Sequence, residues 1–168
     1  NNTASIGNIV VRGCPVFTGY ESFGVSENNF FEDGFFDTGD MGWMDSEGYL
    51  YITGRSKEVI NRGGEIISPF EVEETVISHP LVLQAIAFAM PHDTLQETVG
   101  VVIVPKKGDC RINLAQLRNH CSNNLHQSKW PQVVVFMDAI PKGKTGKVQR
   151  IDLASRMEMK PMSEYWSS

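Results

Sequence analysis

Two apolar segments, Val82–Met90 and Thr98–Val104, constrain the fold of this chain more than any other feature. Each is a run of mostly aliphatic and small residues, and Pro91-His92-Asp93 begins the connection between them. Apolar runs of this length next to turn-forming residues are typical of strands. They predict that the second half of the chain contains a sheet with these two strands in it.

Helical signals flank this strand pair. Ser68-Pro69-Phe70-Glu71 combines a residue that can cap a helix, a proline at the first helical position and a glutamate three residues after the cap. A helix is therefore expected from Pro69 to about Ser78, ending before Pro80. Its acidic residues are expected to be the solvated first turns of the helix, where the helix dipole favours them; they are Glu71, Glu73 and Glu74.

Further along, four apolar residues fall on one helical face behind a capping Asn113: Leu114, Leu117, Cys121 and Leu125. Val133–Met137 predicts a third strand and Asp152–Met157 a last short helix. Residues 57–168 are thus expected to form a small α+β domain of about three strands with helices.

The first part of the chain is expected to be rich in strands. Asn8–Arg12 and Leu50–Thr53 read as strands, and Asp45–Gly48 reads as a hairpin turn before the second of them. Val25–Gly34 shows no clear period and is expected to be a surface loop.

Composition excludes several classes of protein. Fifteen basic and twenty acidic residues give a net charge of −5, which argues against a broad nucleic-acid surface. No apolar run approaches the length of a membrane span. Cys14, Cys110 and Cys121 are odd in number and widely spaced, so we expect reduced, buried thiols, and neither cysteines nor histidines show metal-ligand spacing.

A lysine-rich loop near the end of the chain, Pro141–Arg150, is suited to binding phosphate. Glycines let its backbone approach a ligand, and lysine supplies a mobile positive charge. The segment is not a P-loop, because Val148 stands where Ser or Thr is required and Pro141 where the first glycine is required. Taken alone, it could also be a solvated basic turn.

Four ordered blocks decide between these alternatives: Thr38-Gly39-Asp40, Gly54-Arg55-Ser56-Lys57, the segment Gly63-Gly64-Glu65-Ile66-Ile67-Ser68-Pro69-Phe70-Glu71, and Pro141–Lys147. Their order resembles the adenylate-forming superfamily, which includes acyl-CoA synthetases, peptide-synthetase adenylation domains and luciferases. Gly7–Gly13, with Gly19 and Tyr20, is similar to the block that precedes them.

The resemblance implies that most of the large N-terminal domain is missing. The chain begins at Asn1 and lacks the phosphate loop and acyl pocket of the family. We therefore expect residues 1–56 to be the β-rich end of the large AMP-binding domain and residues 57–168 to be the mobile C-terminal domain. An exposed apolar patch is expected where residues 1–56 would pack on the rest.

The resemblance also assigns roles to individual residues. Asp40 would accept hydrogen bonds from the ribose hydroxyls and Arg55 would contact the nucleotide, although a turn cap and a surface ion pair are the simpler alternatives. Ile52 would pack near the nucleotide, or it is plain core. Lys57 corresponds to the hinge about which the small domain turns.

The remaining roles concern the two half-reactions. Gly63 and Gly64 would line the tunnel for CoA, or they merely form a hairpin that needs positive φ. Lys147 corresponds to the catalytic lysine that stabilises charge as a carboxylate attacks the α-phosphate of ATP. Lys142 and Lys144 would be solvated helpers.

The resemblance thus implies the C-terminal part of an ATP-dependent acyl-CoA synthetase, inactive alone. ATP, CoA and a carboxylic acid would be its substrates, Mg²⁺ would bind with ATP mainly through the missing part, and no metal site is expected in this chain. The sequence around Gly63-Gly64 is similar to that of CoA ligases, including the plant and fungal group acting on oxalate. An intracellular location is expected, cytoplasmic or organellar, with the peroxisome one option.

Two alternatives stay open. The chain could be a non-catalytic interaction or regulatory module that keeps the fold, although Lys147, Arg55 and Asp40 are all present. It could also belong to an adenylating enzyme with another acceptor or a luciferase-type second step.

Overall fold

The structure is a computed structural model that describes residues 5–14, 16, 30–106, 112–143, 146–162 and 164. It divides into two compact units, residues 1–57 and 58–168. The expectations for Gly19, Tyr20, Lys144 and Cys110, and for residues 25–29 of the expected loop, lie outside the described residues.

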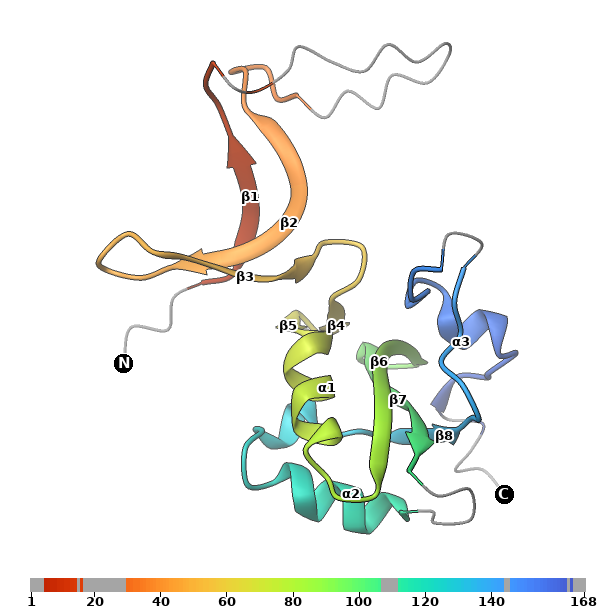
Figure 1. The fold of residues 1–168 in the computed structure, drawn as a ribbon. Helices are drawn as coiled ribbons and strands as arrows, with labels where there is room; N and C mark the ends of the chain where they lie inside the picture. The colour runs from red at the N-terminus through yellow and green to blue at the C-terminus, as the bar shows by residue number, and fades with distance from the viewer. Residues whose placement is uncertain are drawn as a thin grey trace. The chain divides into compact units, whose positions relative to one another are not determined.

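The first unit is an antiparallel sheet of three described strands in the order β1-β2-β3 (Figure 1). These are β1 (Gly7–Val11), β2 (Phe36–Met44) and β3 (Leu50–Arg55). The predicted hairpin turn lies between β2 and β3, where Asp45 Oδ1 accepts hydrogen bonds from the backbone N–H groups of Glu47 and Tyr49. These bonds contribute to lowering the pKa of Asp45, against the opposing effect of desolvation.

Thr38-Gly39-Asp40 lies inside strand β2, so the alternative that Asp40 merely caps a turn assumed the wrong local structure. Strand β2 runs through this segment, although Thr38 and Gly39 have no partner in the described β1–β2 or β2–β3 register. Gly39 adopts a φ of 71°, and the β2–β3 register shifts between Met41 and Gly42. At Gly42 the strands approach so closely that a Cβ would lie 2.4 Å from the carbonyl oxygen of Tyr51. Irregular strands of this kind carry little period-two signal, so the sequence pattern did not reveal β2.

This first sheet has no hydrophobic core of its own within the described residues, where the buried positions are Gly42 and Gly54. Several large apolar side chains are instead exposed: Val10, Val11, Phe31, Met44, Tyr49, Leu50, Tyr51 and Ile52. Trp43 and Tyr51 stack across β2 and β3 with their rings 4.3 Å apart. An uncovered apolar sheet of this kind marks an interaction surface.

The second unit is α+β, as predicted, but its sheet has five described strands instead of about three. The predicted strands are β6 (Val82–His92), β7 (Gln96–Pro105) and β8 (Val133–Phe136). The unpredicted ones are β4 (Ile60–Arg62) and β5 (Glu65–Ile67), each too short to show a period. β6 and β7 form a long antiparallel hairpin, β8 lies parallel to β7, and β4 pairs with β7 at Arg62 and Gln96.

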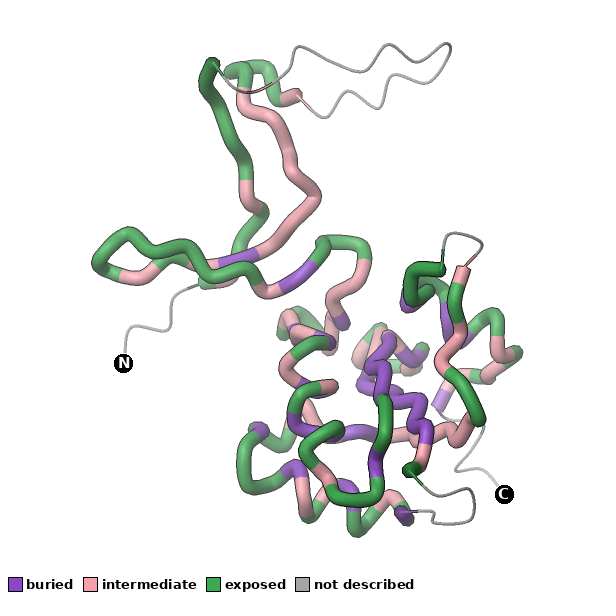
Figure 2. The backbone as a smooth tube through the Cα atoms, in the orientation of Figure 1, coloured by how far each residue is buried: buried purple, intermediate pink, exposed green. Residues whose placement is uncertain are grey.

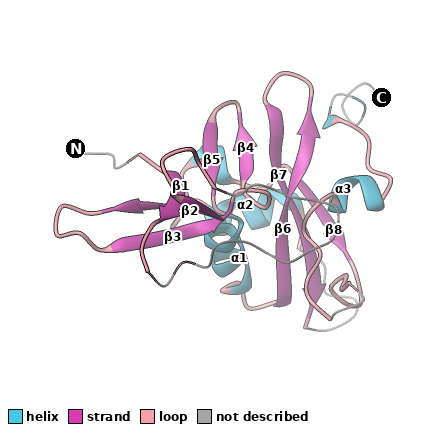
Figure 3. Cartoon of the chain, turned by 90° about the horizontal axis from the view of Figure 1, so that it is seen from above, coloured by secondary structure: helices cyan, strands magenta, loops and turns pink. Residues whose placement is uncertain are grey.

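Helices cover both faces of this sheet. Helices α1 (Pro69–Ile77) and α2 (Leu114–Cys121) contribute to one core, which includes Ile60, Val76, Ala87 and Leu117. Helix α3 (Leu153–Arg156) contributes Leu153 and Ala154 to a second core with Ile86, Phe88 and Met90. Ala85 and Ala87 alternate with Ile86 and Phe88 along β6, so one strand serves both cores. Figure 2 shows buried residues gathered in the second unit, and Figure 3 shows its helices and strands coloured by secondary structure.

Helix ends partly follow the sequence signals. Asn113 forms the full capping box with Gln116, in which each side chain accepts a hydrogen bond from the other residue's backbone N–H. Ser68, in contrast, makes no side-chain capping bond. Of the predicted start signals of α1, the structure shows the proline, Pro69, in the first turn. A short 3-10 helix, η1 (Gln127–Lys129), follows α2.

Candidate functional site

Asp40 and Arg55 lie on neighbouring strands of the first unit and form an ion pair. They are direct partners in the β2–β3 register, and Arg55 Nε lies 3.3 Å from Asp40 Oδ1. Arg55 also donates from Nη1 to the carbonyl oxygen of Thr38. Their side chains remain 34% and 55% exposed, so the carboxylate and the guanidinium are both accessible to a ligand.

The Thr38-Gly39-Asp40 segment holds this pair through its own hydrogen bonds. Thr38 Oγ1 donates to the carbonyl oxygen of Ile9 and accepts from the N–H of Asp40. Gly39 donates from its N–H to Asp37 Oδ1, and its carbonyl oxygen accepts from the N–H of Ser56. At Gly39 an added Cβ would lie 3.7 Å from Arg55 Nη1, and the positive φ would strain it.

Ile52 lies on the same strand as Arg55, and its side chain is 67% exposed. The described residues therefore do not bury it in a core. It belongs to the uncovered apolar surface of the first sheet.

Lys57 lies at the end of the first unit in a turn that spans residues 56–58, and its side chain is exposed. Gly54, just before it, is buried and has a φ of 154°. The residue after Lys57, Glu58, belongs to the second unit.

Gly63 and Gly64 form the exposed tip of the β4–β5 hairpin, flanked by the pair Arg62 and Glu65. Their φ values of 59° and 94° lie in the left-handed region, so the predicted need for glycine at a hairpin is confirmed. Asn61 Oδ1 accepts from the N–H of Gly64, and the carbonyl oxygen of Leu95 accepts from the N–H of Gly63. Beside this tip, Arg62 Nε is buried and has no hydrogen-bond partner in the described part of the chain.

The lysine loop is also a hairpin. Lys142 and Val148 form an antiparallel bridge, and Gly143 donates from its N–H to the carbonyl oxygen of Lys147 at 2.8 Å. Gly146 has a φ of 76° with open space where a Cβ would lie. The side chains of Lys142 and Lys147 are exposed. The hairpin therefore presents Lys147 to solvent beside a residue free of side-chain bulk.

Arg150, directly beyond this hairpin, is the centre of a buried charged cluster that the sequence analysis missed. Its guanidinium donates to Glu58 Oε2 at 2.5 Å, to Glu73 Oε1 at 2.8 Å and to the carbonyl oxygen of Ala87 at 3.0 Å. It lies 4.7 Å from the ring centroid of Phe70, a cation–π contact. Only 8% of its side chain is exposed.

The expectation that the acidic residues of helix α1 are all solvated is wrong for Glu73. Glu73 is largely buried and accepts hydrogen bonds from Arg150 and from the N–H of Ala87. Burial raises the pKa of Glu73, and the bonds from Arg150 and Ala87 oppose that rise. Glu71 pairs with Lys129 Nζ at 2.7 Å. Each of these contacts joins residues that are distant in the sequence, so no local pattern predicts them. The sequence feature that could have drawn attention to Arg150 is its position just after the lysine motif.

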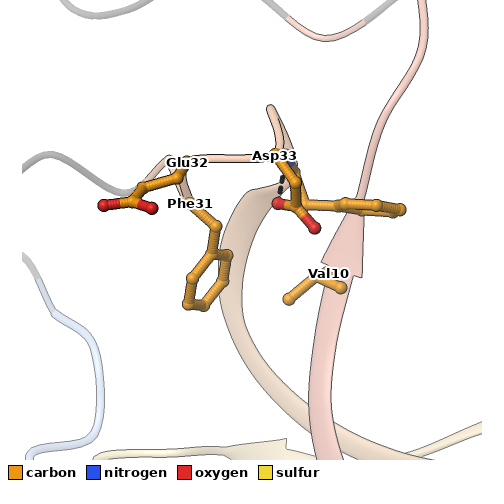
Figure 4. Close-up of a pocket in the computed structure, with 5 residues that line it drawn as sticks. Val10, Phe31, Glu32 and Asp33 are labelled. Atoms are coloured by element: carbon orange, nitrogen blue, oxygen red, sulfur yellow. Dashed lines mark hydrogen bonds between the residues drawn. The ribbon is translucent and has the colours of Figure 1, made fainter.

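A hollow of the first unit lies away from the expected nucleotide residues. Its volume is about 670 Å³, and Val10, Phe31, Glu32, Asp33 and Phe35 line it (Figure 4). Arg12 lies over the Phe35 ring at 4.4 Å and donates to the carbonyl oxygen of Asp33. Neither Asp40 nor Arg55 lines this hollow.

Metal and thiol chemistry find no support in the described residues. They contain no group of three or more His, Cys, Asp or Glu side chains that could hold a metal ion. Burial raises the pKa of the Cys121 thiol to about 11, which makes it unreactive. Cys14 is exposed, so the expectation of buried thiols is wrong for that residue. None of the described helices has the length and apolar character needed to cross a bilayer.

Comparison with known proteins gives a consistent set of relatives. Residues 71–147 match the family described as AMP-binding enzyme C-terminal domain. The chain is 38% identical over 155 residues to oxalate–CoA ligase of Arabidopsis thaliana, covering 92% of this chain and 30% of that protein. It is 42% identical over 147 residues to oxalate–CoA ligase of Saccharomyces cerevisiae, covering 86% of this chain and 27% of that protein.

A solved structure has a similar fold. The ATP-bound MatB structure from Rhodopseudomonas palustris has a TM-score of 0.76 and 35% sequence identity, covering 92% of this chain and 31% of MatB. This chain therefore spans less than a third of the length of these relatives.

Proposed function

The chain belongs to the AMP-binding, adenylate-forming superfamily, and we propose that it is the C-terminal part of an ATP-dependent acyl-CoA synthetase. The observation that carries this proposal is the position of Lys147. It ends the segment that matches the family, and it is exposed on a hairpin whose base leads directly into the buried Arg150 cluster. A lysine held in this way can reach a phosphate without being fixed to another residue of its own unit.

In the first half-reaction, a carboxylate oxygen would attack the α-phosphorus of ATP, and the bond to the pyrophosphate oxygen would break. Negative charge increases around the phosphorus and the acyl oxygen during this step. The Lys147 ammonium would stabilise that charge more in the transition state than in the ground state, which is the condition for faster chemistry.

Asp40 and Arg55 would bind the nucleotide. A carboxylate accepts hydrogen bonds from both hydroxyls of a ribose, and a guanidinium offers donors for ribose or phosphate oxygens. Their cross-strand ion pair supports this role because each charge orients the other while both remain accessible. Ile52 would lie near the nucleotide on the same strand.

In the second half-reaction, the CoA thiolate would attack the acyl carbon, and AMP would leave. Gly63 and Gly64 would border the path of the pantetheine arm, since no Cβ narrows the space at Gly64. Lys57, in its exposed turn, would be the hinge that exchanges Lys147 for this hairpin between the two steps.

We propose a small carboxylic acid as the acyl substrate, with oxalate the first candidate because two relatives are named oxalate–CoA ligases. Mg²⁺ would accompany ATP and supply charge neutralisation at its phosphates. The described residues contain no group of three or more ligand side chains for a metal ion, and most of the Mg²⁺ ligands would come from the part of the enzyme outside this chain. An intracellular location, cytoplasmic or organellar, accompanies this function.

The test is ATP–pyrophosphate exchange by the full-length enzyme, with a panel of carboxylic acids that includes oxalate and with CoA left out. Lys147→Ala should lower exchange by about a hundredfold or more, as expected for loss of a transition-state contact. Lys142→Ala, on the same hairpin, is the matched control and should retain exchange. Absence of exchange with every acid, despite measurable ATP binding, would favour a non-catalytic module.

A further inference from the structure

From the buried cluster around Arg150, we propose that this residue is a positioning residue for Lys147 and fixes the lysine hairpin to the segment that follows Lys57. This inference rests on the proposed function, because Lys147 is its target. It assigns a role to a residue that lies outside the matched family segment and that would not itself touch the substrate.

The first step of the inference is the short chain between anchor and lysine. Arg150 lies three residues after Lys147, so the two Cα atoms are at most about 11 Å apart. The intervening backbone is held by the Lys142–Val148 bridge and by the bond from the N–H of Gln149 to the carbonyl oxygen of Pro141. Whatever fixes Arg150 therefore restricts where the Lys147 ammonium can go.

The second step is the number of elements that the guanidinium joins. Glu58 lies at the start of the second unit, Glu73 belongs to α1 and Ala87 to β6, at sequence separations of 92, 77 and 63 residues. Arg150 is the point at which the lysine hairpin joins all three. Because the planar guanidinium makes these bonds in a fixed fork, a lysine at this position could not reproduce them.

The third step concerns the backbone of Ala87. Its N–H donates to Glu73 Oε1 at 2.8 Å, and its carbonyl oxygen accepts from Arg150 Nε at 3.0 Å. β6 ends the strand order of the sheet, so these two backbone groups lie on its free edge. The Glu73–Arg150 pair accepts from the N–H and donates to the carbonyl oxygen of Ala87, as the backbone of a neighbouring strand would. This gives the hairpin a rigid attachment to the centre of the unit.

The fourth step links the cluster to the hinge. Glu58 is the residue directly after Lys57, and its carboxylate bonds to Arg150. Rotation of the backbone at Lys57 would therefore carry Glu58, Arg150 and the lysine hairpin as one body. The two half-reactions require this, because Lys147 must be delivered for the first step and withdrawn for the second.

The experiment combines Arg150→Lys with Lys147→Ala in the full-length enzyme and measures each half-reaction separately. We expect Arg150→Lys to lower the kcat of adenylation by about a hundredfold with little change in the KM values, because misplacement by about 1 Å has effects of this size. In the Lys147→Ala background the same substitution should cost less than about threefold, since the two residues act as a unit. Thioester formation from supplied acyl-AMP should be spared.

Two further variants separate positioning from folding. Arg118→Lys is the matched control, because Arg118 also bonds a backbone carbonyl, that of Pro131, and a side chain, that of Gln132, within the same unit. It should leave adenylation unchanged. Glu58→Gln removes one charge from the cluster and keeps its shape, so it should lower adenylation by less than Arg150→Lys does.

Three results would each overturn the inference. Arg150→Lys could lower the kcat of adenylation equally with and without Lys147, it could slow both half-reactions equally, or it could leave adenylation at full activity. If no acid is adenylated by the parent enzyme, the proposed function fails and hydrogen exchange decides the positioning role. Arg150→Lys should then accelerate amide exchange in residues 141–150, whereas Arg118→Lys should not. Unchanged protection of that segment would overturn the anchoring role on its own.

Discussion

Asp40 and Arg55 face each other across β2 and β3, with 3.3 Å between the carboxylate Oδ1 and the guanidinium Nε. Exposed pairs of this kind contribute about 0–1 kcal/mol to stability. Asp40→Ala should therefore leave the melting temperature nearly unchanged and raise the KM for ATP by about tenfold or more, as expected for loss of a charged hydrogen bond. Glu47→Ala, an exposed acid of the adjoining turn, is the control. A large stability loss with an unchanged KM would show that the pair is structural.

Lys147→Ala should separate the two half-reactions. Supplied acyl-AMP should still react with CoA at a rate within about threefold of the parent, because the lysine contact belongs to the adenylation transition state. The measurement is thioester formation from acyl-AMP in a stopped or quenched assay. Equal loss of both half-reactions would mean that Lys147 acts in a shared step or in folding.

Gly64→Ala tests the proposed CoA path. Gly64 and Gly48 have φ values of 94° and 88°, and neither has any atom within 4 Å of an added Cβ. Alanine at either position should cost about 1–2 kcal/mol of stability through backbone strain alone. Only Gly64→Ala should also raise the KM for CoA. If the two variants have the same KM for CoA, the positive φ of the hairpin alone explains the glycine at position 64.

The uncovered apolar surface of the first unit should make this 168-residue chain associate when it is prepared alone. Leu50→Thr combined with Ile52→Thr places β-branched strand formers at both positions and removes apolar area, so it should raise the concentration needed for association by about tenfold. Sedimentation velocity over a concentration series measures this. Leu83→Thr, at an exposed position of the second unit, is the control. Monomeric behaviour of the parent chain at high concentration would contradict the prediction.

His79, whose ring lies against that of His120, should make the second unit less stable in mild acid. Their rings are 4.9 Å apart beside a hollow of about 330 Å³, and desolvation, His120 and Lys106 lower the pKa of His79. A histidine whose pKa is lowered by folding binds its proton more readily when unfolded, so this stability is present above about pH 6.5 and is lost as pH falls below that value.

His79→Asn should flatten this pH dependence. The Asn side-chain oxygen can accept the Leu81 N–H as His79 Nδ1 does at 3.2 Å. Thermal unfolding from about pH 7.5 to about pH 5.5 gives the comparison, across the range in which histidine titrates. An identical slope in parent and variant would exclude His79 as the source.

Sequence patterns predicted the parts of the fold that rest on local signals. The long apolar runs of β6 and β7, the proline at the start of α1 and the Asn113 cap of α2 all act over a few residues, and all are confirmed. The strands β2, β4 and β5 were missed because a bulge and two very short segments leave no periodic pattern.

The residues of the candidate site also fall into those that local motifs predicted and those that they did not. The Thr-Gly-Asp, Gly-Arg and Gly-Gly blocks and Lys147 were marked by short motifs. The cluster of Arg150, Glu58 and Glu73 was missed, since its contacts span 77 and 92 residues and Glu73 lies in a helix whose acidic residues have an ordinary solvated interpretation. Long-range charge pairing of this kind depends on how the helix docks on the sheet, which no local pattern records.

The second unit buries apolar side chains on both faces of its sheet, and its boundary falls in the turn at residues 56–58. A genetic crossover at this turn would leave both described core clusters intact and would keep Glu58 with Arg150. Residues 58–168 should therefore be exchangeable between related ligases as one heritable block. Crossovers inside the β6–β7 hairpin would instead break both cores at once, and laboratory recombination libraries should recover few folded chains with junctions there.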